Sequence, residues 1–260
     1  MLAKLIKYEF KSTMRIFLPL YGVLLGFTLI RKLLDILNVE FFFSDGILVT
    51  TYVLMTIGII ALTFIVGILR FYKNILGSEG YLMNTLPVKS WQLVFSKLFT
   101  SVSWFFGSML VLLSSVLIQL SSKGILEDIW ENGKLIWDSL LLEFGWQGGL
   151  LLGELILMLL IYACYGFLMV YCAMAIGHLF NSNRVIYSFV AYIGLYFIVQ
   201  MISLLTMVVY GFGFAGGLAF LERGDIGMTL LTIQLVSSLI ISVAFYMGTN
   251  IIVKKRLNLE

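Results

Sequence analysis

Long, nearly uninterrupted apolar runs constrain the fold of this chain more than any other feature. Each run is close to the length of about 20 residues that a helix needs to cross the hydrocarbon of a bilayer. The chain is 61% hydrophobic and 12% charged, with a mean hydropathy of +1.04, so a water-soluble fold could not bury its apolar surface. The sequence predicts an all-α, polytopic membrane protein with six transmembrane helices. These spans are expected at residues 16–38, 46–69, 98–120, 148–176, 185–210 and 227–252.

The basic residues of the chain gather on one side of this layout, and the other side is net acidic. Because cytoplasmic loops carry an excess of Lys and Arg, we expect the basic side, with both chain ends, to be cytoplasmic. Arg31 and Lys32 are an exception near the outer end of the first span, where long basic side chains can reach the headgroups. The residues on the basic side are Lys4, Lys7, Lys11, Arg15, Arg70, Lys73, Lys89, Lys97, Arg184, Lys254, Lys255 and Arg256.

Residues 1–15 have an amphipathic helical pattern, with apolar side chains on one face and Lys4, Lys7, Lys11 and Arg15 on the other. This pattern predicts an interfacial helix on the inner leaflet. The alternative is a cytoplasmic extension of the first span with a solvated basic face.

The segment between the second and third spans, residues 70–97, is here called the elbow. It is too polar to cross the membrane and too apolar to be a plain linker. Ser78 is a candidate N-cap for a short helix at residues 78–86, Pro87 ends it, and Ser90 can cap the third span. Its exposed apolar residues predict either a docking surface for a protein partner or a contact with the inner ends of the chain's own helices. The site residues proposed for this element are Ser78, Glu79, Tyr81, Leu82, Met83 and Leu86.

Two segments are expected on the outer side. Residues 121–147 have helical periodicity with acidic residues opposite the apolar ones, and Asn132-Gly133 is expected to break them into two short helices. An extracellular amphipathic cap anchored by tryptophans is the simplest interpretation, and a substrate-binding role is the alternative. Residues 210–225 are apolar, short and rich in glycine, which predicts either a re-entrant element near the exit of a translocation path or a flexible loop.

The sequence lacks the motifs of several kinds of catalytic and binding site. There is no G-x-x-x-x-G-K-[ST] P-loop, so ATP-driven transport would need another subunit, and no motif of a membrane protease or hydrolase is present. Cys164 and Cys172 lie eight positions apart in one run, about 12 Å along a helix, and cannot form a disulfide. With His178 as the single histidine, we expect no metal, no cofactor and no enzymatic activity in this chain.

A few polar residues lie within the apolar spans and are candidates for a translocation path. Glu154 is the carboxylate placed well inside a span, where an acid is either functional or a protonated, hydrogen-bonded packing residue. For Gln200 and Gln234 we expect hydrogen bonds between helices rather than contact with cargo. The G-x-x-x-G pairs 22–26 and 149–153 predict close helix packing within or between subunits. A path with so few charges favours lipophilic or amphipathic cargo.

The sequence of the elbow also resembles that of a known protein family. Glu79-Gly-Tyr-Leu-Met-Asn-Thr-Leu-Pro-Val-Lys-Ser-Trp-Gln-Leu-Val-Phe-Ser-Lys97 resembles the EGYL…TLPV…QL…SK signature of ABC-2 type permeases from Gram-positive bacteria. The six-span layout, the basic N-terminal helix and the Lys254-Lys255-Arg256 tail agree with that family over nearly the whole chain.

The resemblance implies a permease dimer, homomeric or heteromeric, in the bacterial cytoplasmic membrane. It implies two separate ATP-binding subunits that hold ATP and Mg, with residues 78–86 as the coupling helix. The layout is similar to exporters of small amphipathic peptides, such as phenol-soluble modulin exporters and bacteriocin self-protection pumps. Membrane lipid is an expected partner and nucleic acid is not. The competing hypotheses are an ion- or proton-coupled carrier that uses Glu154 and a membrane-embedded sensor or scaffold.

Overall fold

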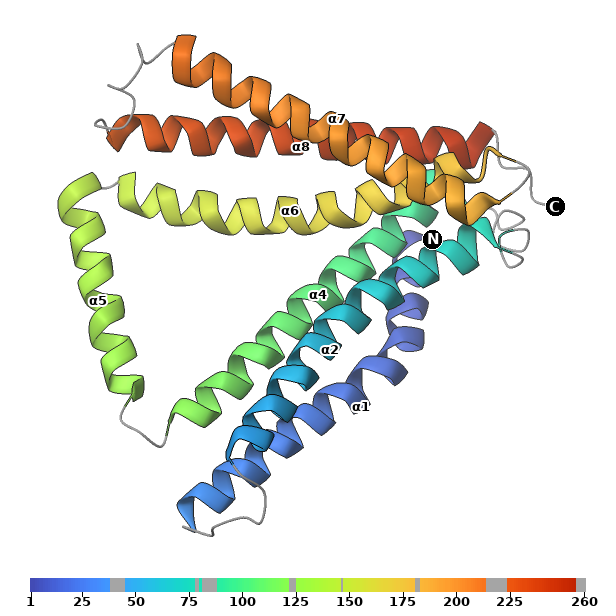
Figure 1. The fold of residues 1–260 in the computed structure, drawn as a ribbon. Coiled ribbons are helices and arrows are strands. Elements are labelled where there is room, and N and C mark those ends of the chain that lie inside the picture. Colours follow the sequence, from blue (N-terminus) through green and yellow to red (C-terminus); the bar gives the residue numbers. More distant parts are fainter. Residues whose placement is uncertain are drawn as a thin grey trace. The chain divides into compact units, whose positions relative to one another are not determined.

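A computed structural model describes residues 1–37, 45–77, 80, 88–121, 125–145, 147–180, 183–213 and 224–255 (Figure 1). These residues are helical, joined by short turns. Six of the helices are long and apolar enough to cross a membrane, which confirms the all-α, polytopic fold class. The elements are α1 (Leu2–Ile36), α2 (Asp45–Phe71), η1 (Tyr72–Leu76), α4 (Ser90–Leu120), α5 (Ile125–Phe144), α6 (Gln147–Gly177), α7 (Arg184–Gly213) and α8 (Gly224–Lys255).

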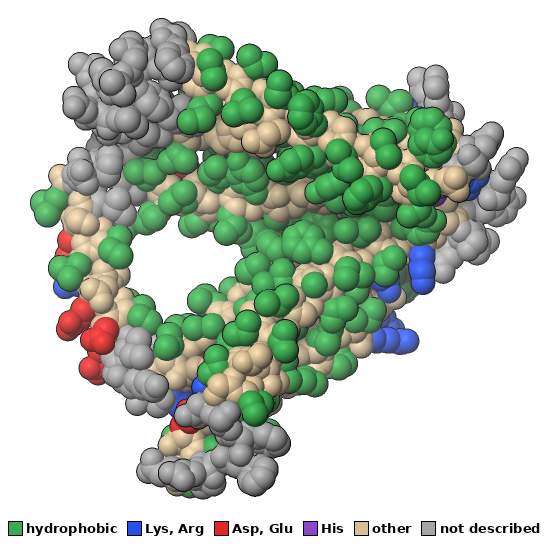
Figure 2. All heavy atoms as spheres, in the orientation of Figure 1, with side chains coloured by type: hydrophobic (Ala, Val, Ile, Leu, Met, Phe, Trp, Pro, Cys, Tyr) green, Lys and Arg blue, Asp and Glu red, His purple; other side chains and the backbone are tan. Residues whose placement is uncertain are grey.

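The chain forms two compact units, and each takes part of α2 and of α4. The first unit comprises Met1–Gly67 and Phe99–Gly145, and the second comprises Ile68–Leu98 and Trp146–Glu260. Figure 2 shows hydrophobic side chains along the helices of both units and acidic side chains gathered on α5. Such apolar outer surfaces fit helices surrounded by lipid tails rather than by water.

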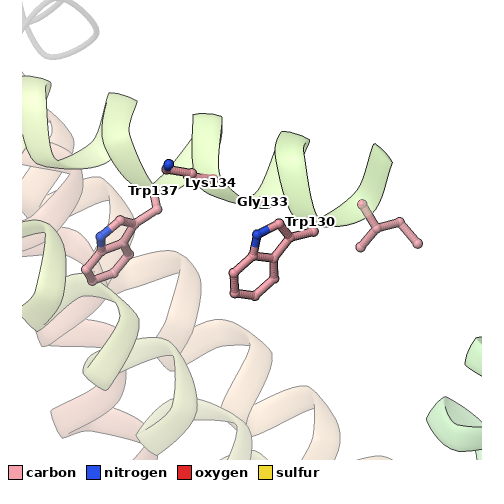
Figure 3. A pocket seen from close by; sticks show the side chains of 5 residues that line it. Trp130, Gly133, Lys134 and Trp137 are labelled. Atoms are coloured by element: carbon pink, nitrogen blue, oxygen red, sulfur yellow. The ribbon is translucent and has the colours of Figure 1, made fainter. Parts of the chain in front are cut away.

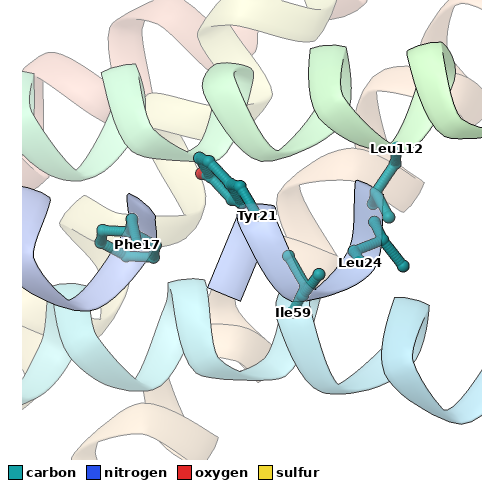
Figure 4. Packing of buried hydrophobic residues seen from close by; sticks show 5 residues of the cluster. All are labelled: Phe17, Tyr21, Leu24, Ile59 and Leu112. Atoms are coloured by element: carbon teal, nitrogen blue, oxygen red, sulfur yellow. The ribbon is translucent and has the colours of Figure 1, made fainter. Parts of the chain in front are cut away.

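The core of the first unit is a stripe of α1 packed against α2 and α4. Phe17, Tyr21 and Leu24 are buried at helical spacing and form a cluster with Ile59 of α2 and Leu112 of α4 (Figure 4). Spacings of three and four residues put side chains on one face of a helix, so α1 turns a single face to its neighbours.

Hydrogen bonds between helices reinforce this core. Ser108 of α4 is hydrogen-bonded to both Tyr21 of α1, at 2.7 Å, and Thr63 of α2, at 2.8 Å. The indole Nε1 of Trp104 donates to Thr13 Oγ1 at 2.7 Å. In lipid, where no water competes for these groups, such bonds hold helices together.

Residues 1–15 and the first span are joined in one continuous helix, α1, which contains Pro19. A proline inside a helix removes one backbone hydrogen bond and clashes with the preceding turn. Figure 1 shows α1 bent in its first half, as this defect predicts. The placement of residues 1–15 at the membrane surface stays a prediction.

The two basic residues near the end of α1 are bound to the end of α4. Lys32 Nζ donates to the carbonyl of Ile118 at 2.8 Å and to the hydroxyl of Ser121, and Arg31 donates to Gln119 Oε1 at 3.4 Å. Carbonyls in the last turn of a helix lack intrahelical partners and attract cations. Lys32 thus caps the end of α4, and Arg31 binds a side chain in the same turn, which gives both basic residues a structural role at this end of the first unit.

The prediction that Asn132-Gly133 breaks the 121–147 segment is wrong. α5 runs without interruption from Ile125 to Phe144. A glycine inside a helix costs only about 1 kcal/mol relative to alanine. That cost is small beside the amphipathic pattern that continues across the pair.

The second unit is built around α6, which packs along both α7 and α8, whereas α7 and α8 barely touch each other. The face of α8 buried in this unit includes Ser238, Ser242 and Thr249. Their hydroxyls donate to carbonyls of the same helix, so small polar side chains can lie in an apolar contact.

Within each unit, neither G-x-x-x-G pair makes a close helix contact with the residues that the structure describes. A Cβ built at Gly22, Gly26, Gly149 or Gly153 would have no neighbour within 4 Å. The prediction of close packing at these glycines therefore remains only for contacts between subunits.

Candidate functional site

The structure describes the flanks of the elbow but not its centre. The predicted coupling residues that lie outside the described residues are Ser78, Glu79, Tyr81, Leu82, Met83 and Leu86. The predicted re-entrant segment likewise lies largely outside them, because the description stops at Gly213 and resumes at Gly224. Gly80 is described, and its N–H donates to the carbonyl of Gly77 at 2.9 Å.

The first flank is a π-helical turn, η1, which continues directly from α2. It ends at Gly77, whose N–H donates to the carbonyl of Tyr72 at 2.7 Å. A Cβ at Gly77 would meet the carbonyl oxygen of Lys73 at 3.0 Å, so a side chain there would be crowded. π-helical turns are rare and frequently lie at functional sites.

Aromatic stacking fixes this flank to α6. The rings of Phe71 and Tyr171 stack with centroids 4.0 Å apart and an interplanar angle of 7°, and both side chains are 0% exposed. Ile75 and Leu76 of η1 are buried as well. Because this contact is closely packed, we infer that a displacement at the start of the elbow is transmitted to α6.

The second flank is fixed to α8. Tyr246 Oη donates to the backbone carbonyl of Trp91 at 2.8 Å. α4 begins at Ser90 itself, and Gln92 Oε1 accepts a bond from the backbone N–H of Lys89, a capping arrangement in which the third helical residue reaches back. The sequence places the third span at residues 98–120 and the start of its helix near Ser90, where α4 indeed begins.

His178 lies where α6 ends, beside η1. Its Nδ1 donates to the carbonyl of Met174 at 2.9 Å, and its ring meets the Tyr72 ring edge-on at a centroid distance of 5.4 Å. Burial lowers the pKa of His178; the bond to Met174 opposes this effect, and the positive charge of Arg184 adds to it. The imidazole is therefore neutral near pH 7.

We expect protonation of His178 to destabilise the second unit. The pKa in the folded chain lies below the value of about 6.5 for an unfolded histidine. The unfolded chain thus takes up the proton first, and stability is lost as the pH falls through about 6.5. The Tm measured by thermal unfolding in detergent between pH 5 and 7.5 checks whether stability falls as the pH is lowered. His178→Gln should flatten this part of the profile, because the chain contains no other histidine.

Polar side chains also share one face of α6 within the apolar span. Glu154, Tyr162 and Tyr165 are spaced by eight and three residues, which places them within an arc of about 80°. Gln234 Nε2 of α8 donates to Tyr162 Oη at 2.9 Å. Gln234 therefore makes a hydrogen bond between helices.

α7 also carries polar side chains along one of its faces. Tyr192, Tyr196 and Gln200 follow at intervals of four residues and share one face of that helix. Tyr192 and Tyr196 lie near Tyr165 of α6. We group Glu154, Gln200 and Gln234 with these tyrosines, because each shares a helix face or a hydrogen bond with one of them. The set, here called the polar stripe, also contains Tyr162, Tyr165, Tyr192 and Tyr196.

The polar stripe offers hydroxyl and amide groups and a single carboxylate. Such groups can hydrogen-bond the polar parts of a cargo while the surrounding surface stays apolar. Across the described ranges, no three His, Cys, Asp or Glu residues come close enough to hold a metal ion. Both cysteines are free thiols.

Sequence reasoning missed the four tyrosines of the stripe and the anchor formed by Phe71 and Tyr171. The tyrosine spacings, i to i+3 on α6 and i to i+4 on α7, were visible in the sequence as a signal. The pairing of Phe71 with Tyr171 joins residues a hundred positions apart, and no local pattern indicates it.

No family model, no curated protein and no solved structure matches this chain. Its own architecture is that of a multi-pass membrane protein, built from six long apolar helices among the described residues. This is a transporter-like arrangement, with a polar stripe inside the span of its second unit.

Proposed function

We propose that this chain is the transmembrane subunit of an ATP-driven ABC exporter of the ABC-2 type. It would move hydrophobic or amphipathic cargo, such as phenol-soluble modulins or antimicrobial peptides, out through the bacterial cytoplasmic membrane. It would act with a second permease copy and two ATP-binding subunits that hold ATP and Mg. Both termini would be cytoplasmic, and this chain would contribute no catalysis.

The observation that carries the proposal is the anchoring of both flanks of the elbow. Phe71 stacks on Tyr171 of α6, and Tyr246 of α8 holds the carbonyl of Trp91. The two anchoring helices also carry Glu154, Tyr162 and Gln234 of the polar stripe. A push on the elbow by a partner would therefore act on the helices that line the proposed path.

The mechanism follows from this linkage. ATP binding closes the two ATP-binding subunits and draws the elbows together. The displacement passes through Phe71 and Tyr246 to α6 and α8, which tilt and change the width of the path. The uncharged hydroxyls and amides of the stripe give an amphipathic cargo weak, exchangeable hydrogen bonds, as a path that must release its cargo requires.

The elbow itself provides the test. Tyr81→Glu with Leu82→Glu should abolish cargo-stimulated ATP hydrolysis in the reconstituted complex, because charges would replace the apolar docking surface. Basal hydrolysis by the ATP-binding subunits should persist. Tyr81→Phe with Leu82→Met keeps the apolar surface and should retain stimulation. Full stimulation in the charged variant, with the permease still folded, would refute the assignment.

The position of Glu154 on the polar stripe favours a second candidate, a proton- or ion-coupled carrier. In that case Glu154→Gln would abolish transport driven by an imposed proton gradient in vesicles that contain this chain alone. The exporter predicts no gradient-driven transport by the isolated chain.

A further inference from the structure

The N-terminal half of α1 carries four basic side chains along one face. Lys4, Lys7, Lys11 and Arg15 fall within an arc of about 80° when each residue advances 100° around the helix. All four side chains are exposed. They are here called the basic stripe, which extends over roughly 16 Å of the helix axis.

The opposite face of this half is already occupied by α4. Phe17 stacks on the indole of Trp104 with ring centroids 4.6 Å apart, and Thr13 Oγ1 accepts the indole N–H at 2.7 Å. Phe10 packs against both Phe99 and Trp104. Over residues 10–17, the apolar face that an interfacial helix would turn to lipid therefore packs on protein instead. The basic stripe is the face left toward the surroundings.

The acidic residues of the first unit lie away from the basic stripe. Glu9 is the one acidic residue among the first 34, and its side chain is 8% exposed, one turn from Thr13 on the side of α1 that faces α4. The other acidic residues of this unit belong to the 35–45 segment and to α5. Asp35 is about 30 Å along the helix from Arg15. On α1 itself, no carboxylate shares the face of the four cations.

The basic stripe begins where the membrane-spanning part of α1 ends. Residues 16–30 carry no charge and form about 22 Å of helix, and Arg31 follows them. This length is less than the roughly 30 Å of the hydrocarbon, so Arg15 has to reach toward headgroups at one boundary. α1 is bent in its first half and contains Pro19 (Figure 1). A bend at this point lets the stripe run across the headgroup layer instead of straight out of it.

Exposed apolar side chains lie among the four cations. Leu18, 53% exposed, falls within the arc of the basic stripe, and Tyr8 and Met14 flank it on either side. Basic groups mixed with apolar ones suit the boundary where headgroups meet lipid tails. A hydrated acidic protein surface would match the charges but not these apolar neighbours, so the composition of this face favours lipid.

We propose that the basic stripe binds the headgroup phosphates of anionic phospholipids in the leaflet that it adjoins. The three ammonium groups and the guanidinium face the phosphates, while Leu18 reaches the acyl chains beneath them. α1 is then held on two sides, by apolar contacts with α4 and by charge on the membrane. This site does not depend on the exporter assignment.

Helix α5 provides a comparison within the same unit. Trp130 and Lys134 line a pocket of about 550 Å³ on one side of this helix (Figure 3). Trp130 is 78% exposed, against 67% for Tyr8. Glu131 and Asp138 lie about one turn or less from Lys134 along α5, so positive charge is not in excess there. Trp130 is therefore an exposed aromatic residue without a basic stripe beside it.

Site-specific photocrosslinking tests the proposal. Tyr8 is replaced by the photoreactive residue benzoylphenylalanine in the full chain, which is placed in nanodiscs of equal parts phosphatidylglycerol and phosphatidylcholine with the same acyl chains. The captured lipids are quantified by mass spectrometry. We expect about fivefold more phosphatidylglycerol than phosphatidylcholine at position 8. The same probe in place of Trp130 should show no preference for phosphatidylglycerol.

Charge variants of the chain with the probe at position 8 identify the cause of the preference. The preference should disappear in Lys4→Gln/Lys7→Gln/Lys11→Gln/Arg15→Gln. It should persist in Lys4→Arg/Lys7→Arg/Lys11→Arg, which keeps the charges. These side chains are exposed, so both variants should fold.

Two further controls need no change in the stripe. Lys254→Gln/Lys255→Gln/Arg256→Gln removes three positive charges elsewhere in the chain and should leave the preference intact. Raising the NaCl concentration from about 0.05 M to about 0.5 M should weaken the preference in the otherwise unmodified chain, because salt screens exposed charges.

Four results would overturn the proposal. The first is equal capture of the two lipids at position 8 in low salt. The second is an undiminished preference in the glutamine variant of the basic stripe, and the third is the same preference at position 130. The fourth is capture of a protein instead of lipid at position 8 in native membranes, which would make an acidic protein surface the occupant.

Discussion

Gly177→Ala is expected to destabilise the second unit by about 3 kcal/mol or more. Gly177 ends α6, and α7 passes directly against it. A Cβ at this position would lie 2.5 Å from the backbone nitrogen and 2.6 Å from the Cα of Ser188, and closer still to its hydroxyl. Backbone atoms cannot move aside as a flexible side chain does, so the α6–α7 hairpin would have to open.

Thermal unfolding in detergent measures this effect, with an expected fall in Tm of roughly 6 to 12 °C. Gly166→Ala is the matched control, because Gly166 lies on the same helix and a Cβ there would have no neighbour within 4 Å. The control should be neutral or slightly stabilising, since alanine is the better helix former. Equal Tm values for the two variants would contradict the close approach of α7 to Gly177.

Tyr171→Ala should cost about 3 to 5 kcal/mol of stability, as expected for a fully buried aromatic side chain. It would also remove the ring on which Phe71 stacks and so weaken the contact between the start of the elbow and α6. We therefore expect two losses together, a lower Tm and, in the proposed exporter complex, a weaker response of ATP hydrolysis to cargo.

Tyr171→Phe is the control for this variant, because it keeps the ring and hence the stack. It should retain most of the stability and nearly all of the coupling. Unchanged coupling in Tyr171→Ala, measured at a temperature where the chain remains folded, would show that force reaches α6 by another route.

The membrane-spanning core of the fold was predictable because apolar length is a strong signal. The expected span at 148–176 corresponds to α6 at Gln147–Gly177, and the span at 185–210 corresponds to α7 at Arg184–Gly213. Hydropathy alone located the helix ends less well, as α4 shows, and the start of that helix was indicated by Ser90 instead. Trp91, Gln92 and Lys97 are helical but not strongly apolar, so hydropathy located the part that crosses the membrane rather than the start of the helix.

The candidate site was predictable to the extent that it consists of polar residues in apolar surroundings. Glu154, Gln200 and Gln234 stood out because such groups are costly in lipid. The tyrosines did not stand out, because residues with aromatic rings are counted as hydrophobic in such a pattern. The π-helical turn at Tyr72–Leu76 and its anchor on Tyr171 depend on packing between distant segments, and no periodic pattern indicates such packing.

Affinity purification of the chain from its native host in a gentle detergent tests the exporter proposal most directly. The bound proteins are identified and quantified by mass spectrometry. The account predicts recovery of a P-loop ATPase in a one-to-one ratio with this chain, and its loss from the Tyr81→Glu/Leu82→Glu variant. Reproducible absence of any such ATPase, with the chain still folded, would contradict the proposal and favour the carrier that uses Glu154.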